Sequence, residues 1–452
     1  MSFVRTGLET DSSTEKKNLL GDRPSAVFVV IYPYKFHDFL HKLLELEQFK
    51  PYCEVIVLDI SAVTTPSFAK SVTAERSERA EVLAVRTMGE FVRHIFSLRR
   101  RSRYENVCIL NEIPNSTWLQ TICNLIIFLT FRLSKAAILD LYNGGQPLRY
   151  RDQGFGRGGD EAGLGTASKI LRFLREVSGP AEAMKKIETA LFTRASRFLP
   201  NATTHRLVAG DDWVALALSK RHRRRNIVLV RGHSHDYSNH LLEAEVSPSK
   251  LEPDLGKVAV LLDGTVPKFN GDSSLLRRKV YLTTGVWYPA LCKWFDAIEK
   301  EQRVQVHVAG HYKTSHPNIA PVFGNRSVHY GKTLQLVRNC EFVITIASTA
   351  ISHAVIHRKP IVFIYSDQLR NDHVSMRMIR GFATMIGNEP VNIDTIDINF
   401  PLALEVNAVK YEEYERACLT SSQGSSRPNF QIILEDILNI QTENDARINV
   451  DL

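Results

Sequence analysis

One segment joins a buried strand to a helix through a turn of small polar residues. It reads EFVITIASTAISHAVIHRKPIVFIY from Glu341 to Tyr365, with Ala347, Ser348 and Thr349 in the turn. Serine is a good N-cap residue, and the first turn of a helix presents unpaired backbone N–H groups at its positive pole. The segment therefore predicts a place where a phosphate binds, although an ordinary strand–helix–strand unit with a capped helix fits the same pattern.

Histidines and a lysine follow another expected strand upstream. The segment from His307 to Pro317 reads HVAGHYKTSHP and places His311, Lys313 and His316 after the strand. Open α/β sheets bind ligands at the carboxyl ends of their strands, so these side chains could neutralise a diphosphate. A loop of polar turn-forming residues is the alternative. His307 alternates with valines within the strand, and we predict a structural role for it.

These features together resemble the donor site of glycosyltransferases with two Rossmann-like lobes, the GT-B architecture. The likeness is greatest to bacterial surface-polysaccharide and capsule transferases, and it covers residues 257–366. The matching positions are Ser348, Thr349, Ala350, Ala354, Lys359 and Pro360. The resemblance implies that the small residues after the strand hold the phosphates of a nucleotide-sugar donor. His353 and His357 stand where related enzymes often carry an acidic residue for the donor ribose, which leaves the nucleotide open.

Carboxylates in the first half are candidates for the chemical step. Sugar transfer needs a base that deprotonates the acceptor hydroxyl, or a group that stabilises a developing cation. Glu112 follows the strand NVCILN, Asp140 lies in AAILDL, and Asp160 and Glu161 lie in a glycine-rich loop that spans residues 142–165. Glu112 fits best by position, at the carboxyl end of a strand. For each residue, an exposed carboxylate without a catalytic role is the alternative.

Two further segments carry polar groups. GHSHDYSNH, from Gly232 to His240, could hold zinc or iron through imidazole and carboxylate groups. No second cluster with metal-ligand spacing accompanies it, so we predict no metal and no cofactor, and interpret the segment as a loop that lines the cleft or as a hinge. Asp263, which ends VAVLLD, could orient donor or acceptor, or simply form a turn.

The elements that must position these residues alternate between strands and helices. Strands are expected at Ala26–Tyr32, Val55–Ile60, Asn106–Leu110, Ala136–Leu141, Asn226–Val230, Val258–Asp263, Val304–Ala309, Phe342–Ile346 and Ile361–Tyr365. Helices are expected at Lys35–Phe49, Glu81–Leu98, Thr117–Leu133, Val286–Gln302, Leu334–Asn339, Thr349–His357 and, in the tail, Ala408–Ile440. Such repeated units make parallel sheets covered by helices.

We therefore predict an α/β protein with two Rossmann-like lobes. The expected parts are a flexible tail over residues 1–23, an acceptor-side lobe over 24–245, a nucleotide-sugar-binding lobe over 255–405, and a C-terminal helical tail over 406–452. The length of 452 residues suits two or three domains. The boundary between the lobes is placed in a stretch with Pro248 and Pro253.

Composition restricts the partners and the compartment. The net charge of +8 favours anionic partners, but its basic runs at Arg99–Arg103 and Lys220–Arg225 are short and lack interleaved aromatics, which argues against nucleic acid. Six cysteines without a C-x-x-C pair fit a reducing compartment. The polar first 23 residues lack the apolar core of a signal peptide. We expect a cytoplasmic protein.

The segment TWLQTICNLIIFLTFRL, from Thr117 to Leu133, needs a separate judgement. It is shorter than the ~20 residues of a membrane span and contains Gln120, Asn124 and Arg132. A buried or interface-lying helix is the better interpretation. Together with the run Arg99–Arg103 it would suit peripheral contact with the anionic inner face of a membrane.

The leading hypothesis is a glycosyltransferase that moves a hexosyl or Kdo-like sugar from a nucleotide-activated donor to a bacterial surface glycan, such as capsule or lipopolysaccharide, or to its lipid-linked precursor. A nucleotide-sugar epimerase or hydrolase of the same shape is one alternative, and a non-catalytic nucleotide- or glycan-binding protein is another. A dehydrogenase is disfavoured, because no G-x-G-x-x-G motif follows the first strand.

Overall fold

The structure is a computed structural model. It describes residues 26–37, 39–64, 81–114, 117–142, 202–218, 227–245, 256–264, 267, 280–311, 322–370, 372–395 and 404–442. All structural statements below concern these residues.

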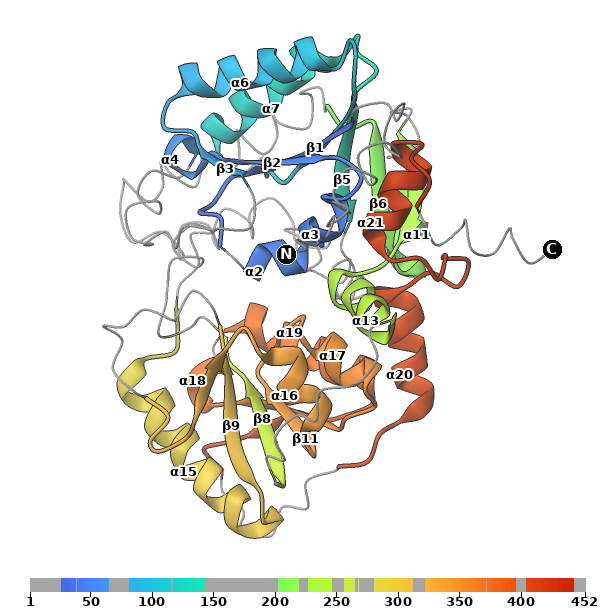
Figure 1. The fold of residues 1–452 in the computed structure, drawn as a ribbon. Coiled ribbons are helices and arrows are strands. Elements are labelled where there is room, and N and C mark those ends of the chain that lie inside the picture. The colour runs from blue at the N-terminus through green and yellow to red at the C-terminus, as the bar shows by residue number, and fades with distance from the viewer. Residues whose placement is uncertain are drawn as a thin grey trace, which may run out of the picture.

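Seven parallel strands form the first sheet, in the order β3-β2-β1-β4-β5-β6-β7 (Figure 1). They are β1 Ala26–Tyr32, β2 Glu54–Asp59, β3 Glu81–Ala84, β4 Asn106–Asn111, β5 Ala137–Tyr142, β6 His205–Ala209 and β7 Val228–Gly232. The inner strand β1 is buried from Ala26 to Ile31. Its continuous run of apolar, mostly β-branched residues suits a parallel strand that is covered on both faces.

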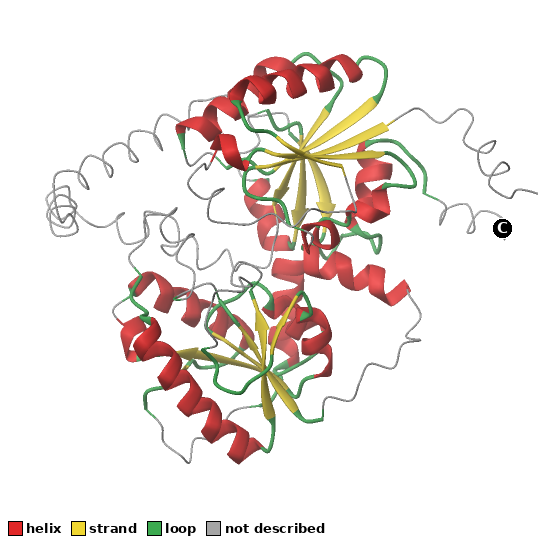
Figure 2. Cartoon of the chain, turned by 60° about the vertical axis from the view of Figure 1, so that its left-hand side comes forward, coloured by secondary structure: helices red, strands yellow, loops and turns green. Residues whose placement is uncertain are grey.

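Six parallel strands form the second sheet, in the order β10-β9-β8-β11-β12-β13. They are β8 Val258–Leu262, β9 Gln305–Gly310, β10 Val328–Tyr330, β11 Phe342–Thr345, β12 Ile361–Tyr365 and β13 Val391–Asn392. Figure 2 shows the two sheets as separate fans of strands. We call the elements from β1 to α13 the first lobe and those from β8 to β13 the second lobe.

Helices cover both faces of the first sheet. One face carries α6 Met88–Arg101 and α7 Trp118–Phe131, whose inner side chains share a core with β1 (Figure 1). The opposite face carries α2 Phe39–Leu43 and α3 Leu46–Phe49. The other helices of this lobe are α4 Ser61–Thr64, α11 Asp211–Ala217 and α13 His235–Glu245.

The second lobe has one continuous core around its sheet. Its helices are α15 Thr284–Gln302, α16 Thr333–Asn339, α17 Ile351–Ile356, α18 Asp367–Arg370 and α19 His373–Ile386. The observed architecture confirms the predicted fold class of two Rossmann-like lobes with parallel sheets. The exact domain boundaries remain a prediction.

The C-terminal segment packs on both lobes in turn. Its first half, α20 Ala408–Tyr414 and the π-helical turn η3 Glu415–Leu419, buries Tyr411 and Tyr414 in the core of the second lobe. Its second half, α21 Asn429–Ile432 and η4 Ile433–Ile437, completes the core of the first lobe. The segment therefore links the two hydrophobic cores (Figure 1).

Several predicted elements differ from the structure. The expected helix Glu81–Leu98 begins with strand β3, and the expected helix Lys35–Phe49 is two short helices that are separated at Glu45, whose φ is 55°. The segment expected to be a loop or hinge, from Gly232 to His240, ends a strand and begins helix α13. Among the described residues, no helix is long and apolar enough to cross a membrane.

Candidate active site at the carboxyl edges of the two sheets

In both sheets the strand order reverses at the same topological position, next to the first strand in sequence. In each, the first strand in sequence lies between the second and the fourth, so that the order reverses between β1 and β4 and again between β8 and β11. Ligands of open α/β sheets bind outside the carboxyl ends of the strands at such a switch point. The residues that follow these four strands are therefore the candidate site.

Glu112 lies at the switch point of the first sheet. It follows β4, and its backbone N–H donates to the carbonyl of Ile31 in β1 at 3.1 Å. Burial raises the pKa of Glu112 to about 7, and the charge of Asp140 adds to the effect. A carboxyl group with a pKa near neutral pH is suited to take up or release a proton during a reaction.

Asp140 has a structural partner instead. It lies on β5, and its Oδ2 accepts from Nη2 of Arg206 at 2.9 Å and from Nε at 3.2 Å. Arg206 stands directly opposite on β6, and its side chain is 6% exposed. Since a buried guanidinium needs a counter-charge, Asp140 is the less suitable base of the two.

The segment predicted to hold phosphate follows β11 at the switch point of the second sheet. Helix α17 begins at Ile351 and its N-cap residue is Ala350, so the prediction of Ser348 as N-cap is wrong. Ser348 Oγ instead accepts from the backbone N–H of Ala350 at 3.2 Å. The N–H groups of Ile351 and Ser352 bond to carbonyls three residues back, at 3.3 and 3.1 Å. Fewer backbone N–H groups at the start of α17 therefore point outward than in the predicted helix with Ser348 as its N-cap.

A carboxylate of the first lobe contacts the helix behind this segment. Asp236, in the first turn of α13, accepts a hydrogen bond from Ser352 Oγ, and its Oδ1 lies 3.3 Å from His353 Nε2. Ser352 Oγ also lies 2.9 Å from the carbonyl of Thr349. The end of the first sheet therefore meets the turn Ser348–Ala350 through Asp236 and Ser352.

The other histidines of this segment contact the surrounding protein. Among the residues that the structure describes, no group of three or more metal-ligating side chains is present. Burial lowers the pKa of His235 to about 4, so its imidazole is neutral at neutral pH. The ring of His233 lies 2.9 Å from Thr420 Oγ1 and 3.1 Å from the carbonyl of Arg427, both in the C-terminal segment.

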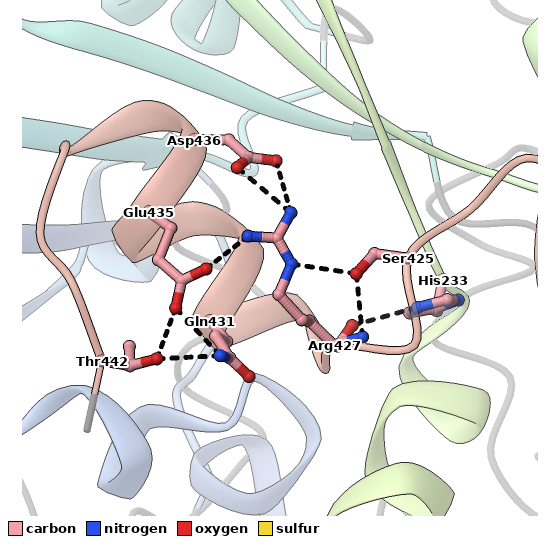
Figure 3. Close-up of polar contacts among 7 residues, drawn as sticks. All are labelled: His233, Ser425, Arg427, Gln431, Glu435, Asp436 and Thr442. Atoms are coloured by element: carbon pink, nitrogen blue, oxygen red, sulfur yellow. Dashed lines mark hydrogen bonds and ion pairs between the residues drawn. The ribbon is translucent and has the colours of Figure 1, made fainter. Parts of the chain in front are cut away.

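Figure 3 shows how that segment is held at this point. Arg427 pairs with Glu435 and, at 3.2 Å, with both carboxylate oxygens of Asp436. Its Nε bonds to Ser425 Oγ at 2.9 Å, and its carbonyl faces the ring of His233. These bonds fix the loop that presents its backbone to the first lobe.

The other predicted site residues are placed as follows. His311 directly follows β9 at the carboxyl edge of the second sheet, and Asp263 follows β8, where its N–H donates to the carbonyl of Ala309 at 3.1 Å. His307 lies within β9 and contacts His329 of β10, with 3.3 Å between Nδ1 and Nε2. Asp160, Glu161, Lys313 and His316 lie outside the described residues, and their roles stay predictions.

Comparisons with known proteins give similarity at low identity. No protein-family model and no curated protein matches the chain. Among solved structures, the chain is similar to the UDP-GlcNAc 2-epimerase from Methanocaldococcus jannaschii (11% identity, covering 92% of this chain and 99% of that one, TM-score 0.42). It is also similar to the glycosyltransferase SnogD from Streptomyces nogalater (14% identity, 87% and 94% covered, TM-score 0.40). A third is MurG from Acinetobacter baumannii (10% identity, 94% and 98% covered, TM-score 0.35). With TM-scores below 0.5, these likenesses establish no activity for this chain.

Proposed function

We propose that this protein is a glycosyltransferase that moves a sugar from a nucleotide-activated donor to a bacterial surface glycan or its lipid-linked precursor. The observation that carries the proposal is the position of Glu112, a carboxyl group whose pKa burial raises to about 7, at the switch point of the first sheet. The sequence resemblance of residues 257–366 to donor sites of two-lobed transferases supports the same assignment.

In the proposed reaction, Glu112 acts as the base. Its carboxylate takes the proton of the acceptor hydroxyl while the acceptor oxygen bonds to the anomeric carbon of the sugar. The bond between that carbon and the phosphate oxygen breaks, and the nucleotide leaves with the bonding electrons. About half of a group with a pKa near 7 is ionised at neutral pH. The carboxylate of Glu112 can therefore accept the proton of the acceptor without the help of a metal ion.

The donor is proposed to lie against the second lobe. The turn Ser348–Ala350 allows a phosphate to approach the backbone closely, because its side chains are small. His311 stands at the end of β9, which β8 separates from β11 in the sheet, and we propose that it and the loop residues Lys313 and His316 face the donor phosphates.

A binding screen with a blocking variant tests the donor site. The melting temperature of the protein is measured with UDP, GDP, CDP, CMP and ADP, in parallel with Ser348→Trp. A nucleotide at ~100 times its dissociation constant stabilises a fold by about 2.7 kcal/mol, which a melting curve resolves. We expect one nucleotide to raise the melting temperature of the wild type and to leave Ser348→Trp unchanged. Equal responses of both proteins, or none in either, would remove the donor site from this position.

The reaction product separates transfer from the two alternatives. The matching nucleotide-sugar is incubated with the protein and with lipid-linked acceptors, and the products are resolved by mass spectrometry and NMR. Release of the free nucleotide together with an acceptor that has gained a sugar supports transfer. A nucleotide-sugar of changed configuration would indicate an epimerase, and release of free sugar would indicate a hydrolase. Binding without any product would favour a non-catalytic protein.

A further inference from the structure

Helix α7 exposes apolar side chains on its outer side, although its inner side already buries Cys123, Ile127 and Phe131 in the core. Gln120, Thr121 and Asn124 are buried against the first lobe. Asn124 accepts from the side-chain amide of Asn111 at 2.8 Å and donates to the carbonyl of Ile113 at 3.2 Å. A helix on the surface of a water-soluble domain normally presents polar and charged side chains on its outer side. The outward side of α7 is therefore unusual and calls for a partner.

The outward apolar residues form one stripe. Trp118 and Ile122 lie one helical turn apart, Leu129 continues the same line, and Leu133 lies in the turn directly after the helix. They are 50%, 43%, 54% and 81% exposed, and Leu119 beside them is 41% exposed. Between Trp118 and Phe131 the helix contains no charged residue. The stripe therefore runs along the whole outer side of the helix.

Helix α6 extends this surface on the same side of the molecule. Both helices pack on the same face of the first sheet (Figure 1). Arg99 Nη2 donates to the carbonyl of Leu133 at 3.3 Å and so joins their C-terminal ends. Phe96 on α6 is 59% exposed. We call these residues the α6–α7 face: Phe96, Trp118, Leu119, Ile122, Leu129 and Leu133.

Basic residues surround the α6–α7 face. The exposed ones on α6 and directly after the two helices are Arg93, Arg100, Arg103, Arg132 and Lys135. The nearby Glu105 is paired with Arg101 at 2.7 Å, and Glu54 is paired with the same guanidinium at 2.6 Å. One guanidinium cannot neutralise both carboxylates, so this cluster keeps one negative charge, and Glu90 on α6 interacts with Arg93. The five exposed basic residues exceed these charges, so the rim of the face is net positive.

We propose that the α6–α7 face docks on the surface of an anionic lipid bilayer. An aromatic and aliphatic stripe with a rim of arginine and lysine fits the boundary between acyl chains and phosphate headgroups. Trp118 suits the interfacial level, where tryptophan is enriched. The proposal does not depend on the sugar chemistry, because it concerns the outer helices of the first lobe and not the carboxyl edges of the sheets.

The positive rim decides between a bilayer and a second copy of the chain. Two copies that met through this face would bring their arginines together, and like charges that face each other oppose association. An anionic bilayer instead offers an apolar layer to the stripe and phosphates to the rim. Exposed apolar patches of this kind mark interaction surfaces, and charge complementarity selects the lipid.

Vesicle co-sedimentation tests the proposal on the full-length protein. Vesicles of phosphatidylcholine alone are compared with a one-to-two mixture of phosphatidylglycerol and phosphatidylcholine. The stripe variant is Trp118→Gln/Leu129→Gln/Leu133→Gln, and the rim variant is Arg93→Gln/Arg100→Gln/Arg103→Gln. Matched controls remove exposed residues of the same kinds from other helices: Val286→Gln/Val374→Gln/Val409→Gln and Lys293→Gln/Lys300→Gln/Arg380→Gln.

We expect the wild type to bind the anionic vesicles and to lose binding as salt is raised. The rim variant should bind about a hundredfold more weakly and the stripe variant at least about tenfold more weakly, while both control variants bind as the wild type does. Melting curves show that each variant is folded. Absence of wild-type binding, or equal losses in the controls, would overturn the proposal. A concentration-dependent dimer that only the stripe variant loses, seen by sedimentation, would assign the face to a second copy instead.

Discussion

At the scale of single residues, Glu112 carries the chemical part of the proposed function. Replacing it with glutamine keeps the shape of the side chain and removes the base, so we expect Glu112→Gln to lower kcat by about 10²–10⁴-fold. Because burial raises the pKa of Glu112 to about 7 and the base must be ionised, kcat/KM of the wild type should rise with pH through that value. Rates of sugar transfer between pH 5.5 and 9 measure both effects.

An exposed carboxylate of the same lobe provides the control. Glu47→Gln, in α3, should leave the rate and its pH profile unchanged, because Glu47 is half exposed and lies on a helix away from the strand ends. A Glu112→Gln enzyme that retains the wild-type rate would exclude Glu112 as the base. The base would then have to be sought in the glycine-rich loop, at Asp160 or Glu161.

A second carboxyl group, Glu45, makes stability depend on pH. Burial raises its pKa to about 7, while the backbone N–H of Phe430 donates to its Oε2 at 2.9 Å. The folded state therefore holds the proton more tightly than the unfolded state, in which the pKa is near 4.5. Its contribution to stability is complete below pH 4.5 and is lost as the pH rises from there through 7.

Glu45→Gln tests this sign. Glutamine cannot ionise, yet it retains an oxygen that accepts from Phe430. The free energy of unfolding of the wild type, relative to that of Glu45→Gln, should fall by up to about 3 kcal/mol between pH 4.5 and 8. Urea unfolding at several pH values measures the difference. A constant difference across that range would show that Glu45 does not change its protonation there.

The sequence predicted which residues lie at the ends of strands, but not which residues their side chains contact. Glu112 was recognised because a continuous apolar run ended just before it, which is a local signal. Arg206, the partner of Asp140, was missed because β6 is short and begins with the polar pair His205 and Arg206. The pairing of β5 with β6 joins residues 66 positions apart, and local patterns carry no information on such pairs.

At the scale of elements, strands were predicted better than helix starts. Buried strands such as β1 are uninterrupted apolar runs, whereas the start of α17 depends on turn hydrogen bonds that follow from tertiary packing. Helix α13 was missed because its first turn contains aspartate and serine, which are as frequent in loops. Its place is set by the contact of Asp236 with Ser352 in the other lobe.

That contact between elements should affect donor binding more than turnover. Ser352 links Asp236 to the carbonyl of Thr349, next to the proposed phosphate site. Ser352→Ala removes the link, and we expect KM for the nucleotide-sugar to rise about three- to tenfold with little change in kcat, as the loss of one or two hydrogen bonds implies. Steady-state kinetics separates the two constants.

Another serine of the same lobe controls for a loss of stability. Ser375 Oγ donates to Asp372 and so makes a hydrogen bond within the first turn of α19. Ser375→Ala should lower the melting temperature to a similar extent and leave KM unchanged. If both variants raised KM equally, or if Ser352→Ala changed kcat alone, then the link through Ser352 would not position the donor segment.

At the scale of the whole molecule, the C-terminal segment couples the two lobes. Its helical pattern was visible in the sequence, but the surfaces on which it packs were not, because its partners lie about 200 residues earlier. The backbone N–H of Ser234 donates to the carbonyl of Leu419 at 2.7 Å, and Ser421 Oγ donates to Asp211 at 2.8 Å. We therefore expect the lobes to unfold together.

Gly210 offers a direct test of this coupling. It has a φ of 79°, and a Cβ at this position would overlap the backbone carbonyl of Ala417 in η3. Gly210→Ala should push the C-terminal segment off the first lobe and lower the free energy of unfolding by about 3 kcal/mol or more. Gly256 is the matched control, because its φ is 68° and a Cβ there meets no atom within 4 Å.

The difference between the two variants isolates the contact from backbone strain. Gly256→Ala should lower the free energy of unfolding only by the strain of the left-handed backbone, about 1–2 kcal/mol. In Gly210→Ala we expect, in addition, that urea unfolding separates into two transitions and that limited proteolysis cuts near residue 420 under native conditions. If both variants lost the same stability and kept one transition, the contact with Ala417 would contribute nothing beyond strain. The coupling would then have to rest on other contacts, such as those of Asp236 or the ion pair between Glu243 and Arg338.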